Sequence, residues 1–127
     1  MIEHAQAEYP KEACGMVLGP GGRLVELHRL ENVDPDPVMR YNVDPKELLR
    51  LTNYMYDKDW DMAAIYHSHT HSPAFPSATD VQLAGYPQAA YILVSLSDRQ
   101  RPDLRAFRII EGNITEMTVE RTPNGQV

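Results

Sequence analysis

The sequence has 127 residues, a length typical of one domain with its own hydrophobic core. Hydrophobic residues make up 43% and charged residues 24%, a composition that argues against extended disorder. The 12 basic and 18 acidic residues give a net charge of −6, and no concentrated basic run is present, so we expect no nucleic-acid partner.

Cysteine content and apolar runs indicate the compartment. The single cysteine, Cys14, excludes an intramolecular disulfide and favours a reducing environment. The longest apolar runs, such as Tyr91–Leu96, are far shorter than the ~20 residues of a membrane span. The first residues lack the pattern of a signal peptide. We therefore expect a cytoplasmic protein that makes no membrane contact.

The first part of the chain predicts a helix, a hairpin and a loop. Ile2, Ala5 and Tyr9 follow helical spacing, and this helix should stop before Pro10. Two apolar, β-compatible runs flank the turn sequence Gly-Pro-Gly-Gly and predict a β-hairpin. These runs are Cys14–Leu18 and Arg23–Leu30. The proline-containing segment Glu31–Val43 predicts a surface loop.

A second helix should begin at Asp44-Pro45-Lys46-Glu47, where Asp44 can cap the helix and Pro45 suits its first position. Leu48, Leu51 and Met55 would share its apolar face, and Asp57–Asp59 would end it.

The remaining elements alternate between buried strands and polar connections. The segments that we expect are a strand at Met62–Tyr66, a loop at His67–Pro76, a helix from Ser77 to before Gly85, a strand at Tyr91–Leu96, and a hairpin of Leu104–Ile110 and Ile114–Glu120. This order predicts a single-domain α/β fold, a mixed β-sheet flanked by helices, over residues 1–120. Residues 121–127 would form a loose C-terminal tail.

The pattern with chemical content is His67-Ser68-His69, with Asp80 eleven residues later. Residues two apart in extended backbone point to the same side, so His67 and His69 can converge while Ser68 faces away. Asp80 lies in the first turn of the next predicted helix, which can return its carboxylate to the histidines. Two imidazoles and a carboxylate are a common zinc set that leaves a fourth position for water.

Hydrolysis at such a centre also needs a proton acceptor and a donor to the developing oxyanion. Glu12, just before the first predicted strand, and Ser77, three residues before Asp80, are candidates for the two roles. Each also has a structural interpretation: Glu12 could be a solvated carboxylate, and Ser77 with Asp80 could form a capping box, a role compatible with catalysis.

The spacing H-S-H-x7-S-x2-D, preceded by a glutamate, resembles the metalloprotease motif of the JAMM (MPN+) family. Three further segments are similar to small prokaryotic members of the CysO–cysteine peptidase type. These segments are Pro10–Gly15, Tyr41–Pro45 and Ile65–His69. The resemblance extends from Ile2 to about Glu120.

The resemblance implies an MPN (cytidine-deaminase-like) fold and a role for each matching residue. His67, His69 and Asp80 would bind Zn²⁺, Glu12 would be the general base, and Ser77 would stabilise the oxyanion. Such enzymes cleave the bond after the C-terminal glycine of a ubiquitin-like protein. The small prokaryotic type would release cysteine from a sulfur carrier that ends in Gly-Gly.

Two other functions remain open at this point. The family includes scaffolds that have lost metal ligands, although this chain retains the complete set. A deconjugase that exposes the carrier terminus for another thiocarboxylate-dependent pathway would use the same residues. Many relatives also carry a strand before the first helix, which this sequence does not display.

Several polar residues have structural roles as their simplest interpretation. We expect Ser68 to hydrogen-bond to neighbouring backbone and Cys14 to be a buried strand residue. His71 would face solvent or substrate, and His4 and His28 would be surface residues.

Overall fold

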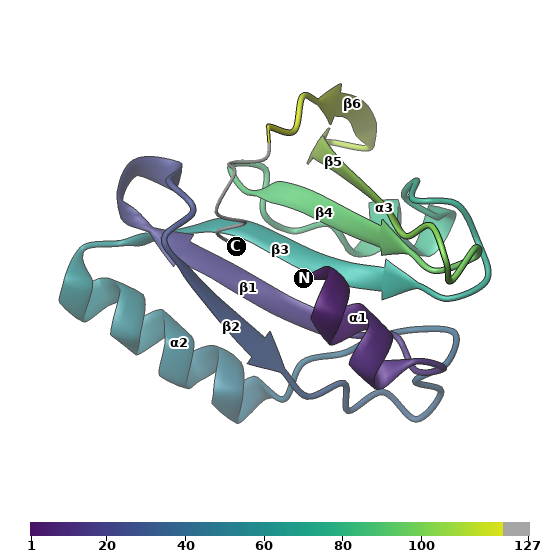
Figure 1. The fold of residues 1–127 in the computed structure, drawn as a ribbon. Helices are drawn as coiled ribbons and strands as arrows, with labels where there is room; N and C mark the ends of the chain where they lie inside the picture. Colours follow the sequence, from purple (N-terminus) through teal and green to yellow (C-terminus); the bar gives the residue numbers. More distant parts are fainter. Residues whose placement is uncertain (121–127) are drawn as a thin grey trace.

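A mixed six-stranded β-sheet organises the chain (Figure 1). The computed structural model describes residues 1–120, and the predicted tail, residues 121–127, lies outside them. In chain order the elements are α1 (Ile2–Glu8), β1 (Cys14–Gly19), the 3-10 turn η1 (Pro20–Gly22), β2 (Glu26–Leu30), α2 (Pro45–Lys58), β3 (Asp61–His69), α3 (Ala78–Leu83), β4 (Ala90–Ser95), β5 (Asp103–Ile110) and β6 (Asn113–Met117).

The strand order is β2-β1-β3-β4-β5-β6. Only β3 and β4 run parallel, and the other neighbouring pairs are antiparallel. A parallel pair needs a crossover connection, and the segment that contains α3 provides it (Figure 1). The predicted α/β fold with mixed strand directions is confirmed.

The helices cover both faces of the sheet. Leu51 of α2 and Val81 of α3 belong to the same apolar cluster as Met16 and Ile65, so these two helices share a face. On the opposite face, Ala5 of α1 packs with Val94 and Leu96. Because side chains alternate along a strand, His67 and His69 lie on the same face as Ile65, under α3.

The predicted second helix is confirmed in its start, face and end. The Asp44 carboxylate accepts a hydrogen bond from the Lys46 amide at 2.9 Å. Leu51 is fully buried, and Leu48 and Met55 pack against the same cluster. The helix ends at Lys58, and its C-cap residue Asp59 has a left-handed backbone.

Two strand boundaries differ from the prediction at the N-terminal hairpin and at the centre of the sheet. β3 continues to His69, three residues beyond the predicted end, because both neighbouring strands extend beside it: His67 pairs with Cys14, and His69 with Ser95. β2 begins at Glu26 rather than Arg23, because the η1 turn takes up Arg23 through its bond to the Pro20 carbonyl.

A third boundary differs at the C-terminal hairpin. β6 ends at Met117 rather than at Glu120, because Met117 is the last residue of this strand that pairs with β5.

The expectation that His4 is a surface residue is wrong. Its side chain is buried between α1 and the sheet, and its Nδ1 lies 2.8 Å from the Tyr66 hydroxyl. Burial lowers the pKa of His4, so the neutral imidazole is favoured there. Periodicity could not reveal this contact, because Tyr66 is 62 residues away in sequence.

Among residues 1–120, no helix has both the length and the apolar character that a membrane crossing requires.

Candidate active site

Three side chains from β3 and α3 converge on one point. His67 Nε2 and His69 Nε2 are 3.2 Å apart. One carboxylate oxygen of Asp80 lies 3.2 Å from His67 Nε2, and the other lies 2.9 Å from His69 Nε2. Both imidazoles are buried, and the Asp80 side chain is largely buried. The predicted convergence of these three residues is therefore present in the fold.

Local structure explains how the carboxylate reaches the histidines. Asp80 occupies the third position of α3, whose N-cap is Ser77. The Asp80 amide donates to Ser77 Oγ at 3.1 Å, and the Ser77 amide donates to Asp80 Oδ2 at 2.8 Å. This reciprocal capping box holds the carboxylate on the side of the helix that faces β3.

The geometry of the three groups suits zinc. Ligands at 2.0–2.1 Å from a tetrahedral zinc ion are separated by about 3.3 Å from one another. The three ligand-to-ligand distances, from 2.9 to 3.2 Å, are close to that value. His67, His69 and Asp80 are the group within the described residues whose donor atoms could hold a metal ion together.

The tautomer of His69 also suits metal binding. Its Nδ1 lies 2.9 Å from the Pro73 carbonyl oxygen, which can only accept a hydrogen bond. The Nδ1 proton is therefore donated to Pro73, so Nε2, which faces Asp80 and His67, is the nitrogen that would ligate a metal once it has lost its proton. Such an outer hydrogen bond is the usual way in which a protein orients a metal-binding imidazole.

The electrostatics of the centre favour a positive charge between the three side chains. Although burial opposes its charged form, hydrogen bonds from both imidazoles hold the pKa of Asp80 well below its usual range. Burial lowers the pKa of His67, so this imidazole is favoured in the neutral form that ligates metals. An anionic carboxylate next to a neutral imidazole is a donor set for a divalent cation.

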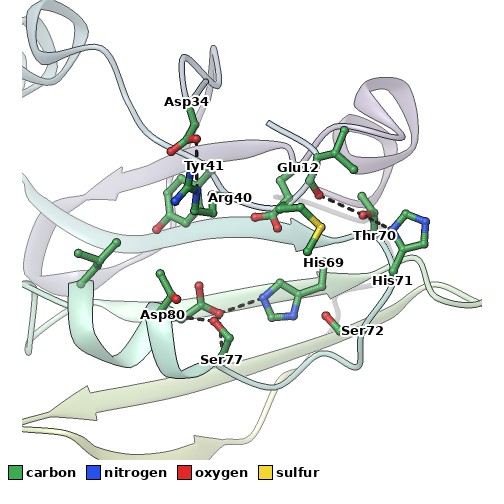
Figure 2. Close-up of a pocket in the computed structure, with 14 residues that line it drawn as sticks. Glu12, Asp34, Arg40, Tyr41, His69, Thr70, His71, Ser72, Ser77 and Asp80 are labelled. Carbon is green, nitrogen blue, oxygen red and sulfur yellow. Dashed lines mark hydrogen bonds and ion pairs between the residues drawn. The ribbon is translucent and has the colours of Figure 1, made fainter. Parts of the chain in front are cut away.

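A cleft of about 350 Å³ opens beside this centre (Figure 2). One wall comes from the segment after β3 and from α3, with His69, Ser77 and Asp80. The opposite wall comes from the loop between β2 and α2 and from Glu12. Figure 2 shows Glu12 across the cleft from Asp80 and Ser77, its carboxylate turned into the space between the walls.

Glu12 is a buried carboxylate, only 7% exposed, at the end of the segment that leads into β1. Burial raises its pKa from 4.5 to about 7, although the nearby His69 acts in the opposite direction. A group with this pKa can accept and return a proton near neutral pH. The structure therefore does not support the alternative that Glu12 is a solvated surface carboxylate.

Ser77 is exposed on the cleft wall next to Asp80. Its oxygen accepts the Asp80 amide as helix cap, which leaves the hydroxyl proton free for another acceptor. The capping interpretation of Ser77 is thus confirmed, and it leaves the predicted donor role available.

Ser68, Cys14 and His71 occupy the kinds of position that the sequence predicts. Ser68 faces away from the cleft, and its Oγ accepts the Ala13 amide at 2.7 Å, as predicted. Cys14 is fully buried, and burial raises its pKa to about 12, so it is not a reactive thiolate. His71 is exposed, lines the cleft and lies outside the group that could hold a metal.

Sequence reasoning assigned no role in the site to Tyr41. Its ring stacks on the imidazole of His67, with centroids 4.4 Å apart and planes 26° apart. Tyr41 belongs to the loop between β2 and α2, which has no periodic pattern to indicate the direction of a side chain.

Comparison with known proteins gives a family match over most of the chain. The family of prokaryotic homologs of the JAB domain matches residues 1–110. A solved structure from Desulfitobacterium hafniense superposes with a TM-score of 0.77 at 33% identity, covering 92% of this chain and 82% of the other.

Two curated relatives carry functional names. The CysO-cysteine peptidase of Mycobacterium tuberculosis is 43% identical over 121 residues, or 94% of this chain and 82% of the relative. A protein of Thermus thermophilus, named as a probable TtuB-protein conjugate cleaving protease, is 34% identical over 91% of this chain and 74% of its own length. The chain therefore belongs to the JAB (MPN-like) family of prokaryotic hydrolases, as its resemblance to JAMM (MPN+) metalloproteases implied.

Proposed function

We propose that this chain is a zinc-dependent peptidase that cleaves the bond after the C-terminal glycine of a ubiquitin-like sulfur-carrier protein and releases cysteine. The observation that carries the proposal is the convergence of His67, His69 and Asp80, with Glu12 across the same cleft. The identity of 43% to a CysO-cysteine peptidase supports the choice of substrate.

The three ligands would be His67 Nε2, His69 Nε2 and a carboxylate oxygen of Asp80. Zinc held by them would supply the Lewis acidity that lowers the pKa of a coordinated water to about 7. The three side chains would not have to move to bind zinc, because the distances between their donor atoms are already close to those between the ligands of a zinc ion.

Glu12 would act as the general base. Its carboxylate accepts a proton from the attacking water while the water oxygen bonds to the glycine carbonyl carbon. When the carbon–nitrogen bond breaks, Glu12 returns that proton to the leaving amine. In the metal-free chain the pKa of Glu12 is about 7, so neither protonation state is strongly favoured at neutral pH, and this supports a role in both transfers.

Ser77 would stabilise the negative charge that develops on the carbonyl oxygen. Its hydroxyl proton is free, because Ser77 Oγ acts as acceptor toward the Asp80 amide. The short helix α3 thus presents a hydrogen-bond donor beside the metal ligand that it also carries.

The partner that we propose is a ubiquitin-like carrier with a C-terminal Gly-Gly. Glycines have no Cβ and can pass close to the cleft floor. Met39 and Leu83 line the cleft and are 66% and 73% exposed, so apolar surface is available to the carrier near its tail.

A second candidate is the cleavage of carrier–protein conjugates. The Thermus thermophilus relative supports it, as does a desampylase of Haloferax volcanii that is 31% identical over 76% of this chain. The same residues would act, and only the leaving amine would differ. A metal-free scaffold is disfavoured, because no member of the ligand set is missing.

We infer that residues 1–120 form a metalloprotease domain and that the protein acts in the cytoplasm. The family match to residues 1–110 supports the first inference, and the single cysteine supports the second.

The direct test is mass spectrometry of CysO–cysteine incubated with the zinc-loaded protein. We expect a carrier product that is lighter than the substrate by one cysteine residue. Chelation of the metal should abolish formation of this product, and added zinc should restore it. Glu12→Gln should keep one zinc per chain and lose activity roughly 10²- to 10⁴-fold, whereas the exposed control Glu31→Gln should keep both. Full turnover by Glu12→Gln would remove Glu12 from the mechanism.

A further inference from the structure

The loop between β2 and α2, residues 31–43, forms one wall of the cleft without a helix or strand of its own. Its regular pairing is limited to one isolated bridge, between Asn32 and Val43. Something other than a helix or a strand must therefore hold Tyr41 against His67 and keep the wall opposite Asp80.

The side chain of Asn32 is at the centre of the contacts that hold this loop. Its Nδ2 donates to the carbonyl oxygens of Glu12 and Arg40, each at 2.9 Å, and makes a longer contact of 3.3 Å to Pro37. Its Oδ1 accepts the amides of Asp34 and Asn42, each at 3.1 Å. One amide side chain thereby satisfies five backbone groups.

These partners determine the orientation of the amide group. The three contacts on Nδ2 are carbonyl oxygens, which can only accept, and the two contacts on Oδ1 are N–H groups, which can only donate. An aspartate of the same shape would place a second oxygen against the carbonyls, so these contacts require an amide.

On one side, the network holds the backbone of Glu12. The Glu12 carbonyl accepts from Asn32, and the Glu12 amide donates to the Pro37 carbonyl at 2.7 Å. The following residue, Ala13, is bound to Ser68 through both of its backbone groups. The Glu12 side chain therefore leaves a backbone that is fixed on both sides.

On the other side, the network holds Tyr41. The Asn32 side chain hydrogen-bonds to the two residues that flank Tyr41 in sequence: it donates to the Arg40 carbonyl and accepts the Asn42 amide. The Tyr41 ring between these two bonds stacks on His67, one of the three converging side chains. A single side chain thus connects the segment of Glu12 with the aromatic ring that packs on His67.

We propose that Asn32 is a positioning residue that sets the Glu12 carboxylate and Tyr41 relative to the centre of His67, His69 and Asp80. This inference rests on the proposed function, because Asn32 would affect turnover only by positioning the general base Glu12. Asn32 itself would contact neither substrate nor metal. A misplacement of about 1 Å in a reacting group can cost roughly 100-fold in rate, so a network of this kind can control turnover.

The test compares Asn32→Asp and Asn32→Ala with the matched controls Asn42→Asp and Asn42→Ala. Asn42 is in the same loop, and its side chain is exposed. With CysO–cysteine as substrate and zinc content verified, both Asn32 variants should lose kcat roughly 10- to 100-fold, with KM within about threefold of the original. The Asn42 variants should stay within about twofold in both constants.

A second readout is independent of turnover. Amide hydrogen exchange in the metal-free protein should accelerate at Glu12 in both Asn32 variants, while the amides of β4 stay protected. The amides of Asp34 and Asn42 should accelerate in Asn32→Ala, which lacks the acceptor oxygen that aspartate keeps. In the Asn42→Ala control the Glu12 amide should exchange at its original rate.

The outcomes separate the two proposals. If the Asn32 variants have a lower Tm but an unchanged kcat at a temperature where they are folded, Asn32 is merely structural and the inference is overturned. Unchanged exchange at the Glu12 amide would overturn it as well. If the unaltered, zinc-loaded chain does not cleave CysO–cysteine, the proposed function fails and the inference fails with it.

Discussion

At the scale of single residues, Ser77 shows how one hydroxyl group can serve both stability and chemistry. Its oxygen caps α3, and its proton remains free to be donated. The two contributions can be separated, because a glycine at an N-cap costs only a few tenths of a kcal/mol, whereas an alanine costs about 1 kcal/mol.

We therefore predict that Ser77→Ala and Ser77→Gly lose kcat alike, on the order of 100-fold, because both lack the donor. Only Ser77→Ala should also lose about 1 kcal/mol of unfolding free energy. Steady-state kinetics and urea denaturation would measure the two effects. A Ser77→Gly variant with normal kcat would show that the hydroxyl is a cap alone.

Glu12 makes the stability of the metal-free protein depend on pH. Its pKa is about 7 in the folded chain, against 4.5 in the unfolded chain, so the folded state binds the proton more tightly. The stabilising contribution is present below pH 4.5 and is lost as pH rises through 7.

Glu12→Gln cannot ionise, so we expect it to become more stable than the original chain between these pH values. The difference should reach on the order of 1–2 kcal/mol by pH 8, less than the full shift implies, because the carboxylate faces the water of the cleft. Urea denaturation with chelator at pH 4.5 and pH 8 would measure it. An equal difference at both pH values would contradict the burial argument.

At the scale of elements, the packing of β1 on β3 depends on one glycine. Gly15 pairs with Tyr66, and a Cβ at Gly15 would overlap atoms of the Tyr66 ring. The ring cannot move away freely, because Tyr66 is fully buried and its hydroxyl is paired with His4.

We predict that Gly15→Ala destabilises the chain by about 1–3 kcal/mol through overpacking. Gly85 is the matched control, since a Cβ there would meet only the Leu83 carbonyl, at 4.0 Å. Gly85→Ala should change stability by less than about 0.5 kcal/mol. Thermal denaturation of both variants is the measurement, and equal Tm values for the two would contradict the prediction.

The elements also show how far sequence reasoning reaches. The cap at Asp44, the capping box at Ser77 and the alternation of His67 with His69 are local patterns, and the structure contains all three features. The fold class followed from the same local patterns. They predict a metal-binding group because its ligands lie within fourteen residues of one another on a strand and the next helix.

What the sequence could not predict depends on contacts between distant segments. The end of β3 is set by β1 and β4, and the burial of His4 is set by Tyr66. The stacking of Tyr41 and the bonds of Asn32 arise in a loop with no periodicity. In each case the partner is brought near by the fold, and no spacing rule identifies it.

At the scale of the whole molecule, the proposed zinc ion would add a further connection between the central sheet and a short helix. It would link the end of β3 to α3, a helix of only six residues. A ligand that binds only the folded state adds about 2.7 kcal/mol at a concentration 100 times its Kd.

We predict that zinc raises the Tm by roughly 10 °C, as expected for that free energy in a domain of this size. His69→Gln should abolish the rise, whereas His71→Gln should retain it, because His71 lies outside the ligand group. Calorimetry with and without zinc would measure these shifts. An undiminished rise in His69→Gln would place the ion elsewhere.

The proposed mechanism depends on one divalent ion bound by His67, His69 and Asp80 beneath Glu12. Anomalous X-ray diffraction at the zinc edge, from crystals of the zinc-loaded protein, would locate that ion. We expect one strong peak at about 2.0–2.1 Å from His67 Nε2, His69 Nε2 and an Asp80 oxygen, with the Glu12 carboxylate facing it. A zinc peak remote from these three side chains, or Glu12 turned away from it, would rule out this metal centre.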